Sequence, residues 1–428
     1  MKSPVIGFAG LTHLGIISVV ASAARGFQVM GYHDDAQLVA ALNRGELHVQ
    51  EPQLKSLLVQ HMARLAFVSS PAGFAECDIV YISVDIPTDE NGVSDLAPIR
   101  SMIDEATSKM RADAILVVLC QVPPGFTRSV VWPETQLFYQ VETLVFGRAV
   151  DRALHPERFI LGCARPLQPV EPRLLRYLEA FACPIFPMCY ESAELAKISI
   201  NMFLVASVTT ANTLAELCEQ VGADWADIVP SLRLDKRIGK HAYLNPGLGM
   251  AGGNLERDLA TVISYAKYHG TDASVVSAWV AHSKYCKNWA LRQLYALVLL
   301  QTPAAKIALL GLTYKEGTHS TKNSAALELL GRISTRNVTA FDPYAADDVT
   351  DSEVIRAQTA IEAIEGADVL LIMTPWPQFK DITGDQLLDS MVGRVIIDPY
   401  RMLDREDLAA KGFTYAALGA PVDSQGVP

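Results

Sequence analysis

The sequence predicts an α/β protein with two doubly wound parallel-sheet domains joined by a central helical region. Three observations support this fold class. A glycine turn between two apolar strands opens the chain, a long stretch with helical periodicity fills the middle, and the opening pattern returns after Thr302-Pro303. Strands that alternate with helical segments are typical of a parallel sheet covered on both faces. A chain of 428 residues is long enough for two or three domains.

The first part of the chain opens with a βαβ unit. An apolar strand at residues 5–10 leads into a glycine turn at 10–15, an apolar helix that reaches Arg25, and a second strand at 27–32. Further strands are expected at residues 79–84 and 114–119. We therefore predict a Rossmann-like domain over residues 1–188.

The middle of the chain has the pattern of long helices. From Glu191 to about Tyr295, apolar residues recur every three or four positions, as at Leu195, Ile198 and Met202. An unbroken apolar stripe on a long helix commonly serves a dimer interface. We predict a helical dimerisation region over residues 189–300 and expect a homodimer.

The last part of the chain repeats the first pattern. A strand at residues 306–311 ends in glycine, a helix at 324–334 follows, and a strand at 338–341 precedes Asp342-Pro343. This order of elements matches the βαβ unit at the start of the chain. We predict a second Rossmann-like domain over residues 301–428.

Composition limits the classes of partner. With 47 acidic and 36 basic residues and a formal charge of −11, the chain lacks a basic footprint for nucleic acid or for an anionic membrane. No apolar run in the sequence approaches the roughly 18 residues that span a bilayer. The seven cysteines are scattered and form no CxxC pair. We expect reduced thiols in a cytoplasmic protein, and no metal site.

The turn at residues 10–15 predicts a dinucleotide site. It reads Gly10-Leu11-Thr12-His13-Leu14-Gly15, close to the G-x-G-x-x-G motif whose glycines let a pyrophosphate approach a helix N-terminus. Thr12 replaces the second glycine, and its hydroxyl could donate to a phosphate oxygen. The strand-turn-helix context favours this interpretation over a purely structural turn.

The end of the second strand bears on the choice of dinucleotide. An acid at this point usually binds the adenosine ribose, but the chain has His33 there, followed by Asp34 and Asp35. Either aspartate could reach the ribose, while His33 could tolerate a 2′-phosphate. Because no arginine follows the strand, NAD is favoured over NADP. The alternative is a solvated turn with helix-capping carboxylates.

Eight short motifs then occur in one order along nearly the whole chain. They are Glu51-Pro52, Val84-Asp85-Ile86-Pro87-Thr88-Asp89, Val122-Pro123-Pro124-Gly125-Phe126-Thr127, Glu194-Leu195-Ala196-Lys197, Arg237-Ile238-Gly239, Leu244-Asn245-Pro246-Gly247, Gly311-Leu312-Thr313-Tyr314-Lys315 and Trp376-Pro377. Together they resemble the UDP-glucose/GDP-mannose dehydrogenase family. The resemblance implies oxidation of the primary alcohol of a sugar nucleotide to a carboxylate, in two NAD-dependent steps through a cysteine-bound intermediate.

The resemblance also implies roles for individual residues. Lys197 and Asn201, one helical turn apart, would stabilise the developing alkoxide. Asp258 would position the lysine and a water, and Glu142 would assist in activating that water. Lys315 would lie near the diphosphate of the UDP- or GDP-linked sugar, and Arg237 would reach a neighbouring subunit's site.

Two sets of binding residues follow from the turn and from the resemblance. The expected cofactor-binding residues are Gly10, Thr12, His13, Leu14, Gly15, His33, Asp34, Val84, Pro87, Thr88 and Gln121. The expected substrate-binding residues are Glu142, Lys197, Asn201, Arg237, Tyr243, Leu244, Asn245, Gly249, Lys315 and Lys322. Lys322 stands where the family usually has arginine. A guanidinium that can form two parallel hydrogen bonds is thus replaced by an ammonium, which acts as a single point charge.

The position of the family's nucleophilic cysteine is occupied by Asn254, in Gly252-Gly253-Asn254 ahead of Asp258. An amide cannot attack an aldehyde at neutral pH, so the thiohemiacetal route is closed. The chain could stop after one hydride transfer, with Asn254 donating to the carbonyl oxygen. Alternatively, Glu142 and Asp258 could activate water to hydrate the aldehyde. Substitution by Cys120 is a weaker alternative, because such a cysteine is usually a buried apolar residue.

A rival from another functional class stays open. The changes at Thr12, His33, Gln121, Asn254 and Lys322 are also what a catalytically silent homologue would show, one that binds a sugar nucleotide and regulates or scaffolds polysaccharide biosynthesis. Retention of Lys197, Asn201 and Asp258 weighs against that rival.

Overall fold

The computed structural model describes residues 3–86, 89, 94–333 and 336–422. The chain divides into two compact units, Met1–Ile200 and Asn201–Pro428. Each unit is described by itself. The division into three domains at residues 188/189 and 300/301 stays a prediction.

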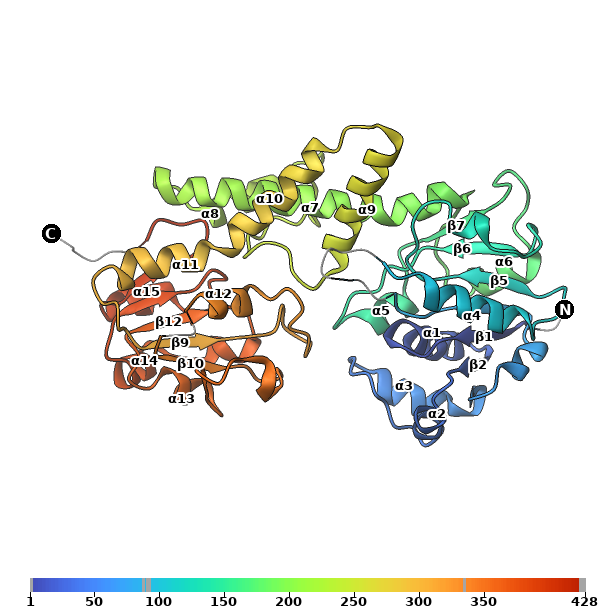
Figure 1. Cartoon of the computed structure of the whole chain (residues 1–428), viewed down its shortest axis with the longest axis horizontal. Helices are drawn as coiled ribbons and strands as arrows, with labels where there is room; N and C mark the ends of the chain where they lie inside the picture. Colours follow the sequence, from blue (N-terminus) through green and yellow to red (C-terminus); the bar gives the residue numbers. More distant parts are fainter. Residues whose placement is uncertain (1–2, 87–88, 90–93, 334–335, 423–428) are drawn as a thin grey trace. The chain divides into compact units, whose positions relative to one another are not determined.

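The first unit is built on an eight-stranded sheet (Figure 1) with the order β3-β2-β1-β4-β5-β6-β7-β8. All neighbours pair in parallel except β6 and β7, which are antiparallel. The strands are β1 (Val5–Ala9), β2 (Gln28–Tyr32), β3 (Leu65–Val68), β4 (Ile79–Ile82), β5 (Ile115–Val118), β6 (Leu137–Gln140), β7 (Phe159–Cys163) and β8 (Ile185–Cys189). Strands β4, β5 and β6 are buried along their whole length, as expected for the centre of a parallel sheet.

The helices of the first unit lie between these strands in the sequence. They are α1 (His13–Ala24), α2 (Ala36–Asn43), α3 (Leu54–His61), α4 (Ala97–Thr107), α5 (Ala149–Leu154) and α6 (Pro172–Glu179). Helix α1 is buried on nearly every side, which explains why its sequence is apolar throughout rather than amphipathic. The predicted βαβ unit is confirmed.

The second unit contains a six-stranded parallel sheet with the order β11-β10-β9-β12-β13-β14. This is the strand order of a doubly wound dinucleotide-type fold. Its strands, coloured orange to red in Figure 1, are β9 (Ile307–Leu310), β10 (Val338–Phe341), β11 (Ile355–Arg356), β12 (Val369–Ile372), β13 (Val395–Ile397) and β14 (Thr414–Ala416). The predicted α/β class with two parallel sheets and a helical middle is confirmed.

The remaining helices belong to the middle of the chain and to the second sheet. They are α7 (Tyr190–Val221), which runs across the boundary between the two units, α8 (Trp225–Leu234), α9 (Asn254–His269), α10 (Ser274–Lys287), α11 (Trp289–Leu294), α12 (Ala325–Ile333), α13 (Ala360–Ile364), α14 (Gly384–Ser390) and α15 (Arg405–Ala410). Within the second unit, Trp289, Leu294 and Val298 pack into the same core as β9 and α12.

Helix α7 passes a simple membrane test that the sequence pattern did not suggest. By length and composition alone it is the one helix in the described part of the chain that could cross a bilayer. Its polar residues Glu194, Asn201 and Asn212 are nevertheless buried against the protein. One such helix is weak evidence for a membrane span, because core helices of soluble proteins pass the same test.

A buried aspartate fixes the glycine turn of the second sheet. Asp342 follows β10 and is 5% exposed. Its oxygens accept hydrogen bonds from the backbone N–H groups of Leu312 (2.6 Å), Thr313 (3.0 Å), Tyr344 (2.8 Å) and Ala345 (2.8 Å), and from the Trp376 indole (3.1 Å). Burial tends to raise the pKa of this carboxyl, but the backbone donors outweigh burial and hold the pKa below its usual range.

We predict that Asp342→Asn destabilises the protein by about 2 kcal/mol at neutral pH, because an amide nitrogen would face N–H groups that now bond a carboxylate oxygen. A depressed pKa stabilises the fold above the unfolded-state value of about 4, and the benefit disappears as pH falls through the folded-state pKa. Urea unfolding should therefore show the difference between the variant and the parent shrinking below about pH 4. The exposed Asp348→Asn serves as the control, and an equal loss in both variants would contradict the account.

Candidate functional site

The first glycine turn leaves the backbone bare where a dinucleotide phosphate would approach. Gly10 has φ +101°, and a Cβ there would lie 2.5 Å from Cγ1 of Val84. A Cβ on Gly15 would overlap the carbonyl oxygen of Gly10. Helix α1 begins within this motif, at His13, so the free N–H groups of its N-terminus lie at the turn. The turn therefore fits the pyrophosphate of NAD.

Thr12 is accommodated in the turn through a neighbouring strand end. Its hydroxyl donates to the carbonyl oxygen of Ser83 at 3.3 Å, and Ser83 Oγ donates to the carbonyl oxygen of Gly10 at 2.8 Å. Leu14, next in the turn, is buried in the core beneath it. The predicted donation from Thr12 to a phosphate oxygen stays a prediction.

The polar residues after β2 divide into two roles. Asp35 caps α2, since its carboxylate accepts the backbone N–H groups of Gln37 and Leu38. His33 Nδ1 lies 3.0 Å from the backbone nitrogen of Asp35 and 3.1 Å from Oδ1 of Asp34. Because Asp35 is engaged by the helix, His33 and Asp34 remain as the predicted contacts to the adenosine ribose.

Three other predicted cofactor residues follow strands β4 and β5. Pro87 and Thr88 lie outside the described residues. Gln121 comes after β5 and directly follows Cys120, whose thiol donates to the carbonyl oxygen of Ile82 at 3.2 Å. Cys120 is completely buried, and burial raises the pKa of its thiol far above the usual range. A thiol in this state is not a nucleophile.

The loop that follows Gln121 is tied to α7 by a buried carboxylate. Glu194, with no exposed surface, accepts the backbone N–H groups of Gly125 (2.6 Å) and Thr127 (2.8 Å). Burial raises the pKa of Glu194, and these hydrogen bonds only partly oppose it. An ion pair between Arg128 and Glu191 holds the same loop to the first turn of α7.

Two of the predicted catalytic residues meet in the first unit. The Nζ of Lys197 lies 3.6 Å from Oε2 of Glu142, with side chains 12% and 19% exposed. Glu142 follows β6, and its other oxygen accepts the backbone N–H of Leu144. The ammonium and the carboxylate thus form a partly buried pair that a ligand can still reach.

Two more predicted catalytic residues meet in the second unit. Asn201 Nδ2 donates to Oδ2 of Asp258, and both residues are buried. Oδ1 of Asp258 lies 3.4 Å from Nε of Arg257. An amide group has two N–H bonds, so Asn201 can present the other one to a ligand while Asp258 orients it. Asn201 lies one turn after Lys197 on α7.

Asn254 opens α9, directly after two glycines with positive φ. Gly253, the N-cap, has φ +93°, and a Cβ there would lie 3.0 Å from Cε of Lys322. The backbone N–H of Gly252 donates to the carbonyl oxygen of Lys322 at 3.0 Å. Asn254 and Asp258 are one turn apart on α9, so the structure brings Asn254, Lys322 and Asp258 into one neighbourhood.

The predicted substrate loop is held by polar groups from two helices. Asn212 Oδ1 accepts the backbone N–H of Gly247 at 2.8 Å, and Ser283 Oγ accepts that of Met250 at 2.7 Å. Gly249 has φ +74°, and a Cβ there would lie 2.5 Å from the carbonyl oxygen of Ser283. The loop therefore needs glycine at this position, and its backbone N–H groups can approach a diphosphate without a side chain between them.

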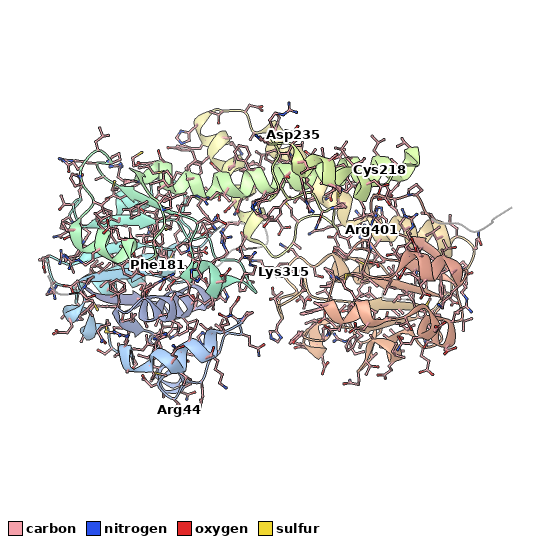
Figure 2. All side chains as sticks on the ribbon, turned by 180° about the vertical axis from the view of Figure 1, so that it is seen from behind. Arg44, Phe181, Cys218, Asp235, Lys315 and Arg401 are labelled. Atoms are coloured by element: carbon pink, nitrogen blue, oxygen red, sulfur yellow. The ribbon has the colours of Figure 1, made fainter. Side chains whose placement is uncertain are left out.

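The start of that loop faces a basic hollow. A cavity of about 300 Å³ is lined by Arg233, Lys240, His241, Ala242, Tyr243, Leu244 and Asn245. Tyr243 is half exposed, whereas Leu244 is buried. Arg237 lies nearby in the sequence, but its guanidinium is 89% exposed and pairs with Asp235 at 2.6 Å; both lie on the segment marked by the Asp235 label in Figure 2. Its predicted reach into a neighbouring subunit stays a prediction.

Lys315, labelled in Figure 2, lies on the loop after β9. This loop begins at Gly311, where φ is +94° and a Cβ would lie 2.5 Å from the backbone nitrogen of Thr374. Asp342 holds Leu312 and Thr313 by their N–H groups. The turn that carries Lys315 is therefore fixed from both sides, although its contact with a ligand stays a prediction.

Three carboxylates are named in the sequence analysis, but the sequence did not predict their structural role. Glu51, Glu194 and Asp342 are buried carboxylates whose donors are mostly backbone N–H groups of distant loops. Glu51-Pro52 and Glu194 stood in the quoted motifs, so the signal that could have found them was a carboxylate inside an otherwise apolar or proline-marked segment. In the described ranges, no group of three or more His, Cys, Asp or Glu side chains could hold a metal ion.

Family models match three successive parts of the chain. The NAD binding domain of the UDP-glucose/GDP-mannose dehydrogenase family matches residues 4–171, the central domain of that family matches residues 191–284, and its UDP binding domain matches residues 308–405. The order of the three models agrees with the order of the two sheets and the helices between them.

Curated relatives match over nearly their full length. The UDP-glucose 6-dehydrogenase of Rickettsia typhi is 28% identical over 439 residues, covering 97% of this chain and 100% of the relative. The UDP-glucose 6-dehydrogenase of Pseudomonas aeruginosa is 28% identical over 442 residues, covering 96% of each chain.

Solved structures share the fold. A UDP-glucose dehydrogenase from Pyrobaculum islandicum matches with a TM-score of 0.84 and 23% identity, over 98% of both chains. A UDP-D-ManNAc dehydrogenase from Pyrococcus horikoshii has the same TM-score and identity, over 97% of this chain and 99% of the other.

We predict that Gly15→Ala weakens NAD binding by at least about 30-fold, because the added methyl group would collide with the carbonyl oxygen of Gly10 and open the turn. Binding is measured by calorimetry with NAD alone. Gly331→Ala is the matched control, since Gly331 lies in α12 with nothing within 4 Å of an added Cβ. Unchanged NAD binding by Gly15→Ala would show that the turn is only structural.

Proposed function

The chain belongs to the UDP-glucose/GDP-mannose dehydrogenase family, and we propose that it oxidises the primary alcohol of a UDP-linked sugar and stops at the aldehyde. The proposal has two parts, the identity of the substrate and the number of oxidation steps. Each part has its own support.

The matched UDP binding domain supports a uridine nucleotide over a guanosine nucleotide. The curated relatives quoted above are UDP-glucose 6-dehydrogenases. UDP-glucose is therefore the first substrate to test, and other UDP-hexoses and GDP-mannose follow.

The residues for the first oxidation are retained. Lys197 and Asn201 lie one turn apart on α7. The same sugar oxygen can therefore accept two hydrogen bonds, one from the ammonium and one from the amide N–H. Asp258 fixes the orientation of that amide. Glu142 beside Lys197 can take the proton of the alcohol through the lysine or a water. When bound, NAD supplies the hydride acceptor.

The residue for a covalent second oxidation is replaced. Asn254 stands at the head of α9, and no cysteine occurs between residues 246 and 258. The Asn254 amide can donate to the oxygen of an aldehyde but cannot attack its carbon. This is the observation that carries the proposal: the groups for alcohol oxidation are retained as two pairs, Lys197 with Glu142 in the first unit and Asn201 with Asp258 in the second, whereas residue 254 is an amide where a second oxidation would need a thiol.

Retention of Lys197, Asn201 and Asp258 supports an active protein over a silent homologue, and the turn that carries Asn254 is well packed. Lys322 packs against Gly253, where a Cβ would be too close. Glu256 accepts a hydrogen bond from Asn323 and lies 3.5 Å from Nζ of Lys287. These contacts hold the first turn of α9, on which Asn254 and Asp258 lie.

We expect one NADH per sugar when UDP-glucose and other UDP-hexoses are incubated with NAD and the purified protein. NADH is followed by absorbance and the sugar product by mass. Two NADH per sugar with a uronate product would support the hydrate route through Glu142 and Asp258 instead. Tight binding of the sugar nucleotide without turnover would establish the silent homologue.

Asn254→Cys extends this test, since a thiolate at the head of α9 is the nucleophile that a second oxidation needs. The expected result is a gain of uronate product. Asn254→Ser, which adds a hydroxyl without a thiol, is the control and should give no uronate.

We also propose that the protein is a homodimer. Several large apolar side chains of the second unit are more than half exposed, on α7 (Phe203, 79%; Leu217, 54%; Val221, 65%), on α8 (Leu234, 85%) and on α10 (Val275, 56%). Exposed apolar residues in such numbers are typical of a subunit interface.

Phe203→Glu should shift the sedimentation coefficient from that of a dimer to that of a monomer, because a carboxylate would then be buried in the interface without a partner. Val392→Glu is the control, since Val392 is similarly exposed (73%) but follows α14 in the second sheet domain. A monomeric parent protein at micromolar concentration would refute the dimer.

A further inference from the structure

We infer that Glu51 is a positioning residue that links the cofactor turn to the loop carrying Glu142. The catalytic consequence rests on the proposed function, in which Glu142 assists at the reacting oxygen. The link itself rests only on contacts within the first unit.

Glu51 is a buried carboxylate with three donors. Its side chain is 1% exposed. Oε1 lies 2.9 Å from Nε2 of His13 and 2.9 Å from the backbone nitrogen of Gly147, and Oε2 lies 3.2 Å from the backbone nitrogen of Ala149. A carboxylate so far from water is stable only while its donors stay in place.

The three donors come from two segments with different predicted tasks. His13 is the first residue of α1, at the N-terminus where the dinucleotide phosphates are expected. Gly147 lies in the loop between β6 and α5, which also carries Glu142, and Ala149 is the first residue of α5. Glu51 is therefore the group through which these two segments meet.

A second contact joins the same two segments. The ring of His13 lies 4.1 Å from that of Phe146, between their centroids, at an interplanar angle of 36°. The ring of His13 thus packs against Phe146, while its Nε2 forms a hydrogen bond with Glu51. Because an ionised carboxylate can only accept, Nε2 of His13 must carry the hydrogen.

The other end of the loop is the predicted catalytic group. Glu142 accepts the backbone N–H of Leu144 and lies 3.6 Å from Nζ of Lys197. The short loop is consequently fixed at Glu142 by its own turn and at Gly147 and Ala149 by Glu51. A shift of His13 on cofactor binding would be passed to Glu142 through this loop.

Coupling of this kind is reciprocal. If a cofactor at the α1 N-terminus strengthens the contacts of Glu51, then losing those contacts must weaken cofactor binding by the same factor. Glu51 therefore affects two measurable quantities, the affinity for NAD and the order of residues 144–149.

The experiment measures hydrogen exchange of the full-length protein with and without NAD, in the parent and in Glu51→Gln and Glu51→Ala. In the parent, NAD should slow exchange both at residues 10–15 and at residues 144–150, where the amides of Gly147 and Ala149 bond Glu51. In Glu51→Ala, protection at residues 10–15 should persist at saturating NAD, while protection at residues 144–150 is lost. Glu51→Gln, which keeps one acceptor oxygen, should give an intermediate result and covers the case in which Glu51→Ala does not fold.

Steady-state kinetics supply the second readout. With UDP-sugar and NAD both saturating, kcat of Glu51→Ala should fall at least about 10-fold, while KM for the sugar nucleotide changes by less than about 3-fold. Glu46→Ala is the matched control, because Glu46 lies in the same segment but is exposed and pairs only with Arg44 in the contacts described; Arg44 is labelled in Figure 2.

The two proposals fail in distinguishable ways. Absence of turnover by the parent would refute the proposed function and leave the exchange result intact. NAD-dependent protection at residues 144–150 that persists in both Glu51 variants would refute the positioning role, whatever the activity.

Discussion

The placement of Lys197, the predicted catalytic lysine, depends on the hydrogen bonds that the buried Glu194 carboxylate accepts from the amides of Gly125 and Thr127. They join the first turns of α7 to the loop after β5. Lys197 lies on the next turn of the same helix, beside Glu142, so the place of its ammonium over the sheet is set by Glu194. A buried carboxylate without donors is costly, so these bonds fix the part of α7 from which Lys197 extends.

Buried carboxylates hold three other turns of the two units in the same way. The N–H groups of such turns have no strand to pair with and must find other acceptors. Glu51 accepts the N–H groups of residues 147 and 149. Asp342 accepts those of the turn after β9, and Asp398 accepts those of Met402 and Leu403 after β13. Both halves of the chain therefore contain turns held by buried carboxylates, and two of these, Asp342 and Asp398, directly follow the strands β10 and β13.

The fold was largely predictable, because runs such as Ile79–Ile82 and Ile115–Val118 are apolar, β-branched and fully buried. Five strands, β1, β2, β4, β5 and β9, are one or two residues shorter than predicted. At β4 the chain leaves the sheet at Ser83, whose hydroxyl donates to the carbonyl oxygen of Gly10. The glycine turn and the residues of the Lys197–Glu142 and Asn201–Asp258 pairs could also be named from the sequence. The partners of Glu51 and Glu194 could not, because they lie far along the chain and pair through backbone N–H groups, which leave no side-chain signature.

The claim that Asn254 ends the reaction at the aldehyde is tested most directly with UDP-glucose carrying two deuterium atoms at C6. Loss of one deuterium gives an aldehyde, and loss of both gives a carboxylate. We predict a product that retains one deuterium at C6, appears in equal amount to the deuterated NADH, and is captured by hydroxylamine as an oxime. A uronate that has lost both deuterium atoms, formed by the parent protein, would contradict the account.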